Sequence, residues 1–279
     1  MQITSNRTRD LYLDLLKKSL LNLIYLDNEL RIHYILSRIQ AREGFEIGYL
    51  KDIRQTEGER YADYSQARRD GQNYRLPRGF GVYSHTLLGT ARLDNIEQLV
   101  ASVLAEDVPG DLVEAGVWRG GGSIFMRGVL KAFDVTDRNV WVCDSFCGLP
   151  EPEVAQDAGQ EFHTLDFLSI NVDTVRDNFS CYDLLDEQVR FVEGFFADSL
   201  PTAPINEIAV LRLDGDLYKS TMDTLEPLYD KVSPGGYIIV DDYNIPVCRQ
   251  AVEDFRSANG IDEEIIGIDW TGVYWRKRL

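Results

Sequence analysis

The chain has 279 residues, which suits one α/β domain with additions or a core with a small lid and is enough to bury a sizeable hydrophobic core. Its net charge of −17 opposes binding to nucleic-acid phosphates and to anionic membranes, so we expect neither as a partner. No apolar run approaches the roughly 18 residues of a membrane span, and the N-terminal MQITSNRTRD lacks a secretory pattern, so we expect a cytoplasmic protein. The four cysteines include no CxxC pair, so we expect no zinc site.

The N-terminal part of the chain combines a helix with a polar segment. Residues 10–25 carry leucines at helical spacing and predict an amphipathic helix. Residues 40–82 are polar, punctuated by glycine and rich in Tyr and Arg. We interpret them as lid or loop, with some helix around residues 51–70.

From residue 93 onward, apolar strands alternate with amphipathic helices. The predicted helices are residues 93–107, 122–133, 172–185, 220–232 and 246–260. The predicted strands are residues 111–116, 141–146, 188–194, 207–216 and 237–243, followed by a hairpin over 263–277 that turns at Thr271-Gly272. This order indicates a parallel sheet with right-handed crossovers, closed by a C-terminal antiparallel hairpin. Such a closing hairpin is more typical of methyltransferases than of dehydrogenases.

A glycine-rich bend follows the first of these strands. It has Glu114 just before the turn and spaces its glycines as Gly116-x-x-x-Gly120, without the GxGxxG of a dinucleotide site. A carboxylate at that point repels a phosphate but attracts the ammonium of an amino-acid ligand. S-adenosylmethionine has that ammonium, a sulfonium and no phosphate, so the bend favours it as the cofactor.

The next strand and the one after it supply further candidates for the cofactor site. Asp144 ends the strand WVCD, where an acid commonly accepts both ribose hydroxyls. Phe195 and Phe196 follow the strand VRFVEG and either flank an adenine or pack in the core.

Two later strands end in acids. Asp214 ends LRL, and Asp241 and Asp242 end IIV. Three carboxylates brought together repel one another unless a cation joins them, and oxygen ligands favour Mg2+, Ca2+ or Mn2+. Asp216 fits either a position behind these ligands or a helix cap. His85, in SHTLLG, is either a base at the cofactor mouth or a structural histidine.

These residues resemble the macrocin O-methyltransferase family, whose relatives methylate macrolide sugars and the sugar of novobiocin. The resemblance covers nearly all of residues 84–279 and the N-terminal helix, and it does not extend over about residues 28–82. The matching stretches are LYLDLLKKSLLNLIY, SHTLLG, VPGDLVEAGVWRGGGSIFMRGVLKAFDVTDR, WVCDSFCGLP, LRLDGDLYKSTMD, SPGGYIIVDDYNIPVCRQAV and GVYWR.

The resemblance implies a class I methyltransferase fold of the Rossmann-like α/β type, with an N-terminal helix and lid over residues 1–83 and an adenosylmethionine-binding catalytic domain over residues 84–279. It implies a cytoplasmic homodimer or higher homo-oligomer that serves secondary metabolism. The expected cofactor-binding residues are Glu114, Gly116, Val117, Trp118, Asp144, Ser145, Phe195 and Phe196. The expected Mg2+ ligands are Asp214, Asp241 and Asp242.

The function expected from these assignments is Mg2+-dependent O-methylation of a natural-product hydroxyl. The acceptor is either a sugar with vicinal hydroxyls or a catechol-like phenol, because both offer two adjacent oxygens to the metal. Asp214 is the candidate to receive the proton, with His85 in reserve. The alternatives are an NAD-dependent oxidoreductase on a similar sheet and a non-catalytic adenosylmethionine-binding protein.

Overall fold

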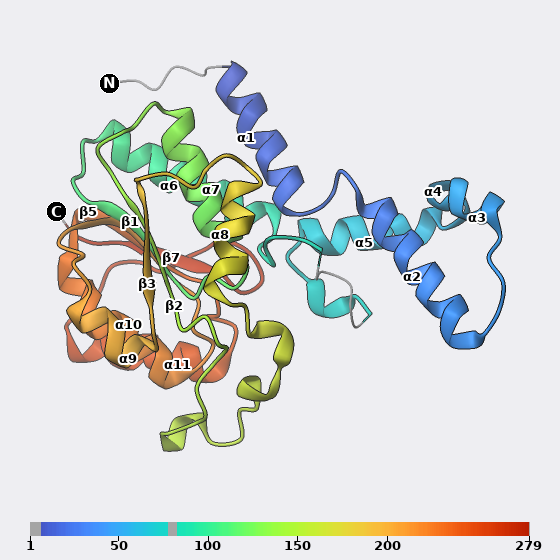
Figure 1. Ribbon diagram of the computed structural model, residues 1–279. Helices are drawn as coiled ribbons and strands as arrows, with labels where there is room; N and C mark the ends of the chain where they lie inside the picture. Colours follow the sequence, from blue (N-terminus) through green and yellow to red (C-terminus); the bar gives the residue numbers. More distant parts are fainter. Residues whose placement is uncertain (1–6, 78–82, 279) are drawn as a thin grey trace.

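In the computed structural model, which describes residues 7–77 and 83–278, a mixed sheet is covered by helices on both faces (Figure 1). Residues 78–82 of the expected lid lie outside the described residues. The helices are α1 (Arg7–Leu20), α2 (Leu26–Ala41), α3 (Ile47–Lys51), α4 (Ile53–Thr56), α5 (Gly58–Arg69), α6 (Thr90–Ala105), α7 (Gly121–Ala132), α8 (Val172–Ser180), α9 (Phe196–Ser199), α10 (Tyr218–Leu228) and α11 (Pro246–Ala258). The strands are β1 (Asp111–Ala115), β2 (Val140–Asp144), β3 (Val189–Glu193), β4 (Ile208–Leu213), β5 (Val232–Val240), β6 (Ile266–Gly267) and β7 (Val273–Arg276).

The sheet has seven strands in the order β3-β2-β1-β4-β5-β7-β6. Strands β1 to β5 pair in parallel, whereas β7 runs antiparallel to both β5 and β6. The expected α/β fold, a mostly parallel sheet with an antiparallel C-terminal hairpin, is therefore confirmed.

Successive residues of the central strands point into two different cores. On β1, Leu112 packs in a core beneath α1, α6, α7 and α8, whereas Val113 and Ala115 pack in a core with α10 and α11. The helices lie over the two faces in the same division (Figure 1). Burial on both faces explains why these strands read as continuous apolar runs.

The N-terminal part of the chain forms a helix on the body and an arm that projects from it. Helix α1 packs against α7, and α2 to α5 (residues 26–69, called the arm below) extend away from the sheet (Figure 1). The arm and the segment that follows it share a small separate core, formed by Leu26, Leu30, Ile53, Tyr64, Ala67 and Leu76. No helix within the described ranges is both long and apolar enough to cross a membrane.

The structure differs from the sequence expectation chiefly in this region. Helix α1 ends at Leu20, so Leu23 lies beyond it, although Leu23 is still buried. The helix expected around residues 51–70 is present as α4 and α5, but α2 was not predicted.

Candidate active site

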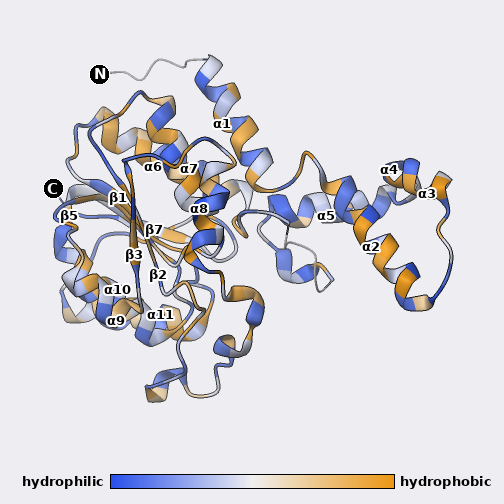
Figure 2. Ribbon diagram, in the orientation of Figure 1, coloured by the Kyte–Doolittle hydropathy of each residue, from blue (hydrophilic) through white to orange (hydrophobic). Residues whose placement is uncertain are grey.

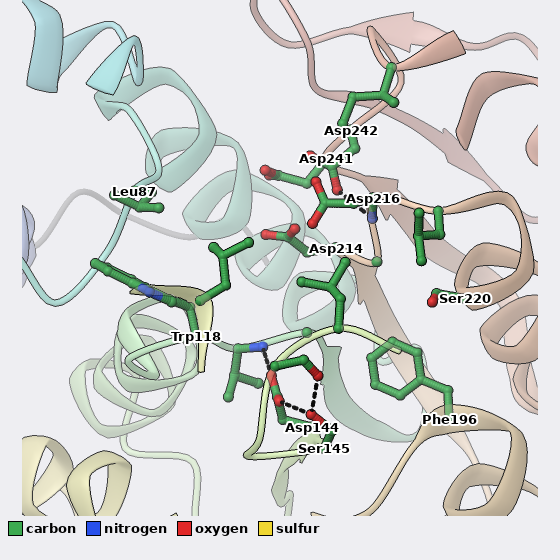
Figure 3. A pocket seen from close by; sticks show the side chains of 18 of the residues that line it. Leu87, Trp118, Asp144, Ser145, Phe196, Asp214, Asp216, Ser220, Asp241 and Asp242 are labelled. Atoms are coloured by element: carbon green, nitrogen blue, oxygen red, sulfur yellow. Dashed lines mark hydrogen bonds between the residues drawn. The ribbon is translucent and has the colours of Figure 1, made fainter. Parts of the chain in front are cut away.

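A cavity of about 670 Å³ opens at the carboxyl ends of the parallel strands. The turns after β1, β2, β4 and β5 line it, together with residues 71–74 and 86–88 of the N-terminal part and with residues of the long loop between β2 and α8. Asp144 and Ser145 lie at one side of this cavity and the acidic residues after β4 and β5 at the other, with Trp118 and Leu87 on a third wall (Figure 3). The position agrees with the general rule that open α/β sheets bind ligands at this edge.

The turn after β1 comes unusually close to the neighbouring strand end. Gly116 has φ +90°, and a Cβ added to it would lie 1.7 Å from the backbone oxygen of Asp214. A Cβ on Gly122, in the first turn of α7, would lie 2.1 Å from Oε1 of Glu114. Only glycine fits these positions, so the glycine-rich turn lies directly beside the end of β4.

Three non-glycine residues at the strand ends also have left-handed backbones: Trp118 (φ 48°), Phe146 (φ 54°) and Asp216 (φ 56°). They follow β1, β2 and β4, and this conformation is costly for a bulky side chain. The indole Nε1 of Trp118 donates to the carbonyl of Phe167 at 2.8 Å, which joins the β1 turn to the β2–α8 loop. Of these three residues, Trp118 and Asp216 line the cavity, whereas other left-handed residues such as Asn22 and Asp134 lie elsewhere.

Asp144 closes the second strand as expected, and its side chain organises the turn around it. Its carboxylate accepts backbone N–H groups of Val117 and Phe146, each at 2.8 Å. Burial raises the pKa of Asp144, and these two donors oppose the rise. The hydroxyl of Ser145 donates to the carbonyl of Gly148 at 2.6 Å. Phe195 and Phe196 line the same cavity.

Three carboxylates lie together on the opposite side. One oxygen from each of Asp214, Asp216 and Asp242 lies within 4.8 Å of the others, and Asp242 also accepts the backbone N–H of Asp216 at 3.2 Å. Removal from water and the charge of Asp214 raise the pKa of Asp216 to about 8. The same two causes hold the pKa of Asp242 well above its usual range. Such mutual destabilisation of the charged forms is what a bound cation relieves.

Asp241 lies apart from this group of three. Its carboxylate pairs with Arg92 and, at 2.5 Å, with Arg212. Although burial acts against it, these two guanidinium groups hold the pKa of Asp241 below its ordinary value. The group of three therefore contains Asp216, whereas Asp241, the third expected Mg2+ ligand, pairs with arginines beside it, and its ligation of a metal stays a prediction.

Arg212 connects the two sides of the cavity. Its Nη1 lies 2.6 Å from Glu114, and its Nη2 lies 2.9 Å from Asp214. Glu114 also accepts a hydrogen bond from the hydroxyl of Ser123. Burial raises the pKa of Glu114 to about 7, against the opposing effect of Arg212. An unbroken row of charged groups thus runs from the glycine-rich turn to the acidic cluster.

Comparison with known proteins identifies the group to which this site belongs. The model of the macrocin O-methyltransferase family (TylF) matches residues 9–277, so the expectation that the resemblance stops over about residues 28–82 is wrong. The chain belongs to the macrocin O-methyltransferase family. It is similar to the 8-demethyl-8-(2,3-dimethoxy-alpha-L-rhamnosyl)-tetracenomycin-C 4'-O-methyltransferase of Streptomyces olivaceus, at 46% identity over 96% of this chain and 93% of the relative.

Two further relatives agree in class. The demethyldecarbamoylnovobiocin O-methyltransferase of Streptomyces niveus is 54% identical over 72% of this chain and 78% of its own. The structure of the O-methyltransferase NovP superposes with a TM-score of 0.79 at 44% identity, covering 97% of this chain and 100% of that chain. The expectation of an O-methyltransferase is therefore confirmed, and the NAD-dependent oxidoreductase alternative is wrong.

In the present chain, His85 is not among the residues that line the cavity. Its Nδ1 lies 2.8 Å from the hydroxyl of Tyr182, and the two rings meet edge to face. Burial lowers the pKa of His85, with Arg119 adding to the effect. This environment fits a structural histidine better than a base at the cofactor mouth.

Other parts of the site were missed by sequence reasoning. Arg212 could have been found from the sequence, because it is the charged residue of an otherwise apolar strand, and a buried guanidinium needs acidic partners. Arg92 lies in α6, outside any motif, and nothing in the sequence marked it as part of the site. Tyr74 and Trp270 also line the cavity, one from the polar N-terminal segment and one from the hairpin turn.

Proposed function

We propose that this protein transfers a methyl group from S-adenosylmethionine to a sugar hydroxyl of a natural-product intermediate, with Mg2+ as the metal. The observation that carries the proposal is the acidic cluster of Asp214, Asp216 and Asp242, which faces the glycine-rich turn and Asp144 across one cavity (Figure 3). One side suits the cofactor, and the other suits the hydroxyl that receives the methyl.

The residues on the cofactor side fit S-adenosylmethionine. Gly116 and Gly122 carry no side chain, so the backbone at the start of α7 is open to a ligand. Glu114 places a carboxylate beside this backbone, and the turn lacks the glycine pattern of a phosphate-binding site. Asp144 and Ser145 lie at the end of β2, where ribose hydroxyls bind in related folds. S-adenosylmethionine bound there supplies the methyl group on its sulfonium.

The residues on the other side fit a hard divalent cation. Asp214, Asp216 and Asp242 offer oxygen ligands only, as Mg2+ prefers, and burial together with the neighbouring carboxylates raises the pKa of each of them. Mg2+ held there would lower the pKa of an acceptor hydroxyl. Asp241 holds the arginines behind this cluster, and we assign it that supporting role in place of direct ligation.

The chain's own residues then position and deprotonate the acceptor. Arg212 holds the carboxylate of Asp214 at 2.9 Å and so fixes it at the boundary of the two halves of the cavity. From that position Asp214 receives the proton of the acceptor hydroxyl as the oxygen gains the methyl group.

The acceptor class follows from the relatives. The Streptomyces olivaceus enzyme is named as the 4'-O-methyltransferase of a rhamnosyl compound, which favours a sugar over a catechol-like phenol. We also propose that the protein acts as a homo-oligomer.

The proposed function is tested with the purified chain, S-adenosylmethionine and a rhamnosylated acceptor. Methyl transfer should occur with Mg2+ and cease when a chelator removes it. Asp214→Asn should abolish turnover while leaving the affinity for S-adenosylhomocysteine nearly unchanged. Asp223→Asn is the matched control, because Asp223 lines the same cavity but pairs with Lys219 at 2.8 Å, so turnover should persist. Near-normal turnover of Asp214→Asn would contradict the proton-acceptor role.

A further inference from the structure

Two aromatic rings stand together on the cavity wall without a part in methyl transfer. Tyr74 follows the arm, and Trp270 lies in the turn between β6 and β7. Their centroids lie 5.5 Å apart with the planes inclined by 59°, and both residues line the cavity. Tyr74 is 71% exposed and Trp270 is 41% exposed, so both present ring surface outside the hydrophobic cores. We call this pair the aromatic shelf.

The shelf is held in place by contacts between distant parts of the chain. The indole Nε1 of Trp270 donates to the carbonyl of Asp70 at 3.0 Å, which ties the hairpin turn to the segment that carries Tyr74. Arg92 strengthens the same junction, since its Nε lies 3.0 Å from Asp269 and its Nη2 donates to the carbonyl of Gly71. A preorganised aromatic surface binds a ligand at low entropic cost.

The shelf adjoins the acidic cluster. Thr271, next to Trp270, donates its hydroxyl to the backbone carbonyl of Asp241 at 3.0 Å, and Asp242 follows directly in the chain. Asn73, next to Tyr74, also lines the cavity. Its Nδ2 donates to the carbonyl of Leu87 at 2.9 Å, which ties the segment that carries Tyr74 to residues 86–88 of the same wall.

We propose that Tyr74 and Trp270 bind a flat apolar group attached to the acceptor sugar, an aryl aglycone. The inference rests on the proposed function in one respect, namely that the sugar's hydroxyls are held at the neighbouring acidic cluster. The shelf then selects acceptors by what the sugar is attached to, and the cluster selects the hydroxyl. Contacts with one aromatic ring of this kind change affinity by roughly tenfold.

The test compares two ligands that share a sugar. The protein, loaded with S-adenosylhomocysteine and Mg2+, is titrated calorimetrically with p-nitrophenyl α-L-rhamnoside and with methyl α-L-rhamnoside. We expect the wild-type chain to bind the aryl glycoside about tenfold more tightly. Trp270→Ala and Tyr74→Ala should each remove most of that preference while leaving affinity for the methyl glycoside and for S-adenosylhomocysteine unchanged.

The control is Trp270→Phe, which keeps a flat ring but loses the indole N–H that reaches Asp70. It should retain most of the preference for the aryl glycoside, which separates ring contact from loss of the loop junction. Equal affinity of the wild-type chain for the two glycosides, or binding of neither while S-adenosylhomocysteine binds, would overturn the shelf. Failure to bind S-adenosylhomocysteine would instead contradict the proposed function.

Discussion

At the turn after β1, the chain passes so close to the end of β4 that individual positions must be glycine. Gly116 and Gly159 both have left-handed backbones, at φ +90° and +86°. A Cβ on Gly116 would collide with the backbone oxygen of Asp214, whereas a Cβ on Gly159 would meet nothing within 4 Å. A comparison of the same substitution at the two positions therefore separates the cost of backbone strain from the cost of steric collision.

We predict that Gly159→Ala costs only the strain of a left-handed alanine, roughly 1–2 kcal/mol of unfolding free energy. Gly116→Ala should cost clearly more and abolish binding of S-adenosylhomocysteine, because β1 and β4 must move apart. Thermal unfolding and calorimetric titration of the two variants measure both effects. Equal losses of stability in the two variants would show that the contact with Asp214 is dispensable.

The acidic residues of the site also show which of its features could be predicted from the sequence and which could not. The positions of Glu114, Asp144 and Asp214 at the cavity were predictable because each lies at or next to the carboxyl end of an apolar strand, and parallel strands bring these ends to one edge. The pairing of Asp241 with two arginines, which leaves Asp216 beside Asp214 and Asp242, was not predictable. It depends on the left-handed backbone of Asp216 and on the positions of Arg92 and Arg212, and neither follows from spacing.

At the scale of elements, the ends of β4 and β5 form a cluster whose protonation affects folding. The pKa of Asp216 is raised to about 8, and that of Asp242 is raised as well. Between the ordinary carboxyl pKa of about 4 and the raised values, the folded state therefore holds more protons than the unfolded state. The stability that the protonated cluster provides is lost as pH rises through this window.

We predict that the melting temperature of the metal-free protein falls as the pH rises from about 6 to about 8. Millimolar Mg2+ should raise the melting temperature more at the higher pH, because its carboxylate ligands must be deprotonated. Asp216→Asn should weaken both effects. Thermal melts with chelator and with Mg2+ at each pH provide the measurement, and a gain from Mg2+ that is the same at both pH values would argue against a metal at this cluster.

Most helices and strands of residues 90–276 were predicted because a large core imposes clear periodicity on them, but the short helix α9 was not. Helix α2 was not predicted either, because only Leu26, Glu29 and Leu30 of its residues are buried, and its main packing partners are α4 and α5. It also ends at Arg42 in a left-handed conformation, so the glycine that usually marks a helix end is missing. Small local contacts, including the buried pair of Arg68 with Glu29, determine this part of the fold.

At the scale of the whole molecule, the surface of α1 and the arm is unusually apolar. Helix α1 buries Leu13, Leu16 and Leu20 against the body, yet Leu11 and Leu15 are 61% and 57% exposed. Being four residues apart, these two leucines share an outer face, so the helix is apolar on both sides. In the arm, the ribbons of α2 and α3 also carry hydrophobic residues (Figure 2). The exposed hydrophobic residues of α2, α3 and the loop between them are Leu36, Ile39, Phe45 and Ile47.

A surface of this kind is what an interface between copies of the chain would bury, which supports the proposed homo-oligomer. We predict that light scattering coupled to size-exclusion chromatography finds two or more chains per particle. The double variant Leu11→Glu with Leu15→Glu should shift the particle to a single chain, because paired charges on the outer face of α1 oppose burial. Leu165→Glu is the control, since Leu165 is also partly exposed but lies in the loop between β2 and α8, at the opposite end of the body from α1 (Figure 1), and it should leave the mass unchanged. A wild-type particle of one chain would refute the homo-oligomer, and a double variant that keeps the wild-type mass would place the interface elsewhere than on α1.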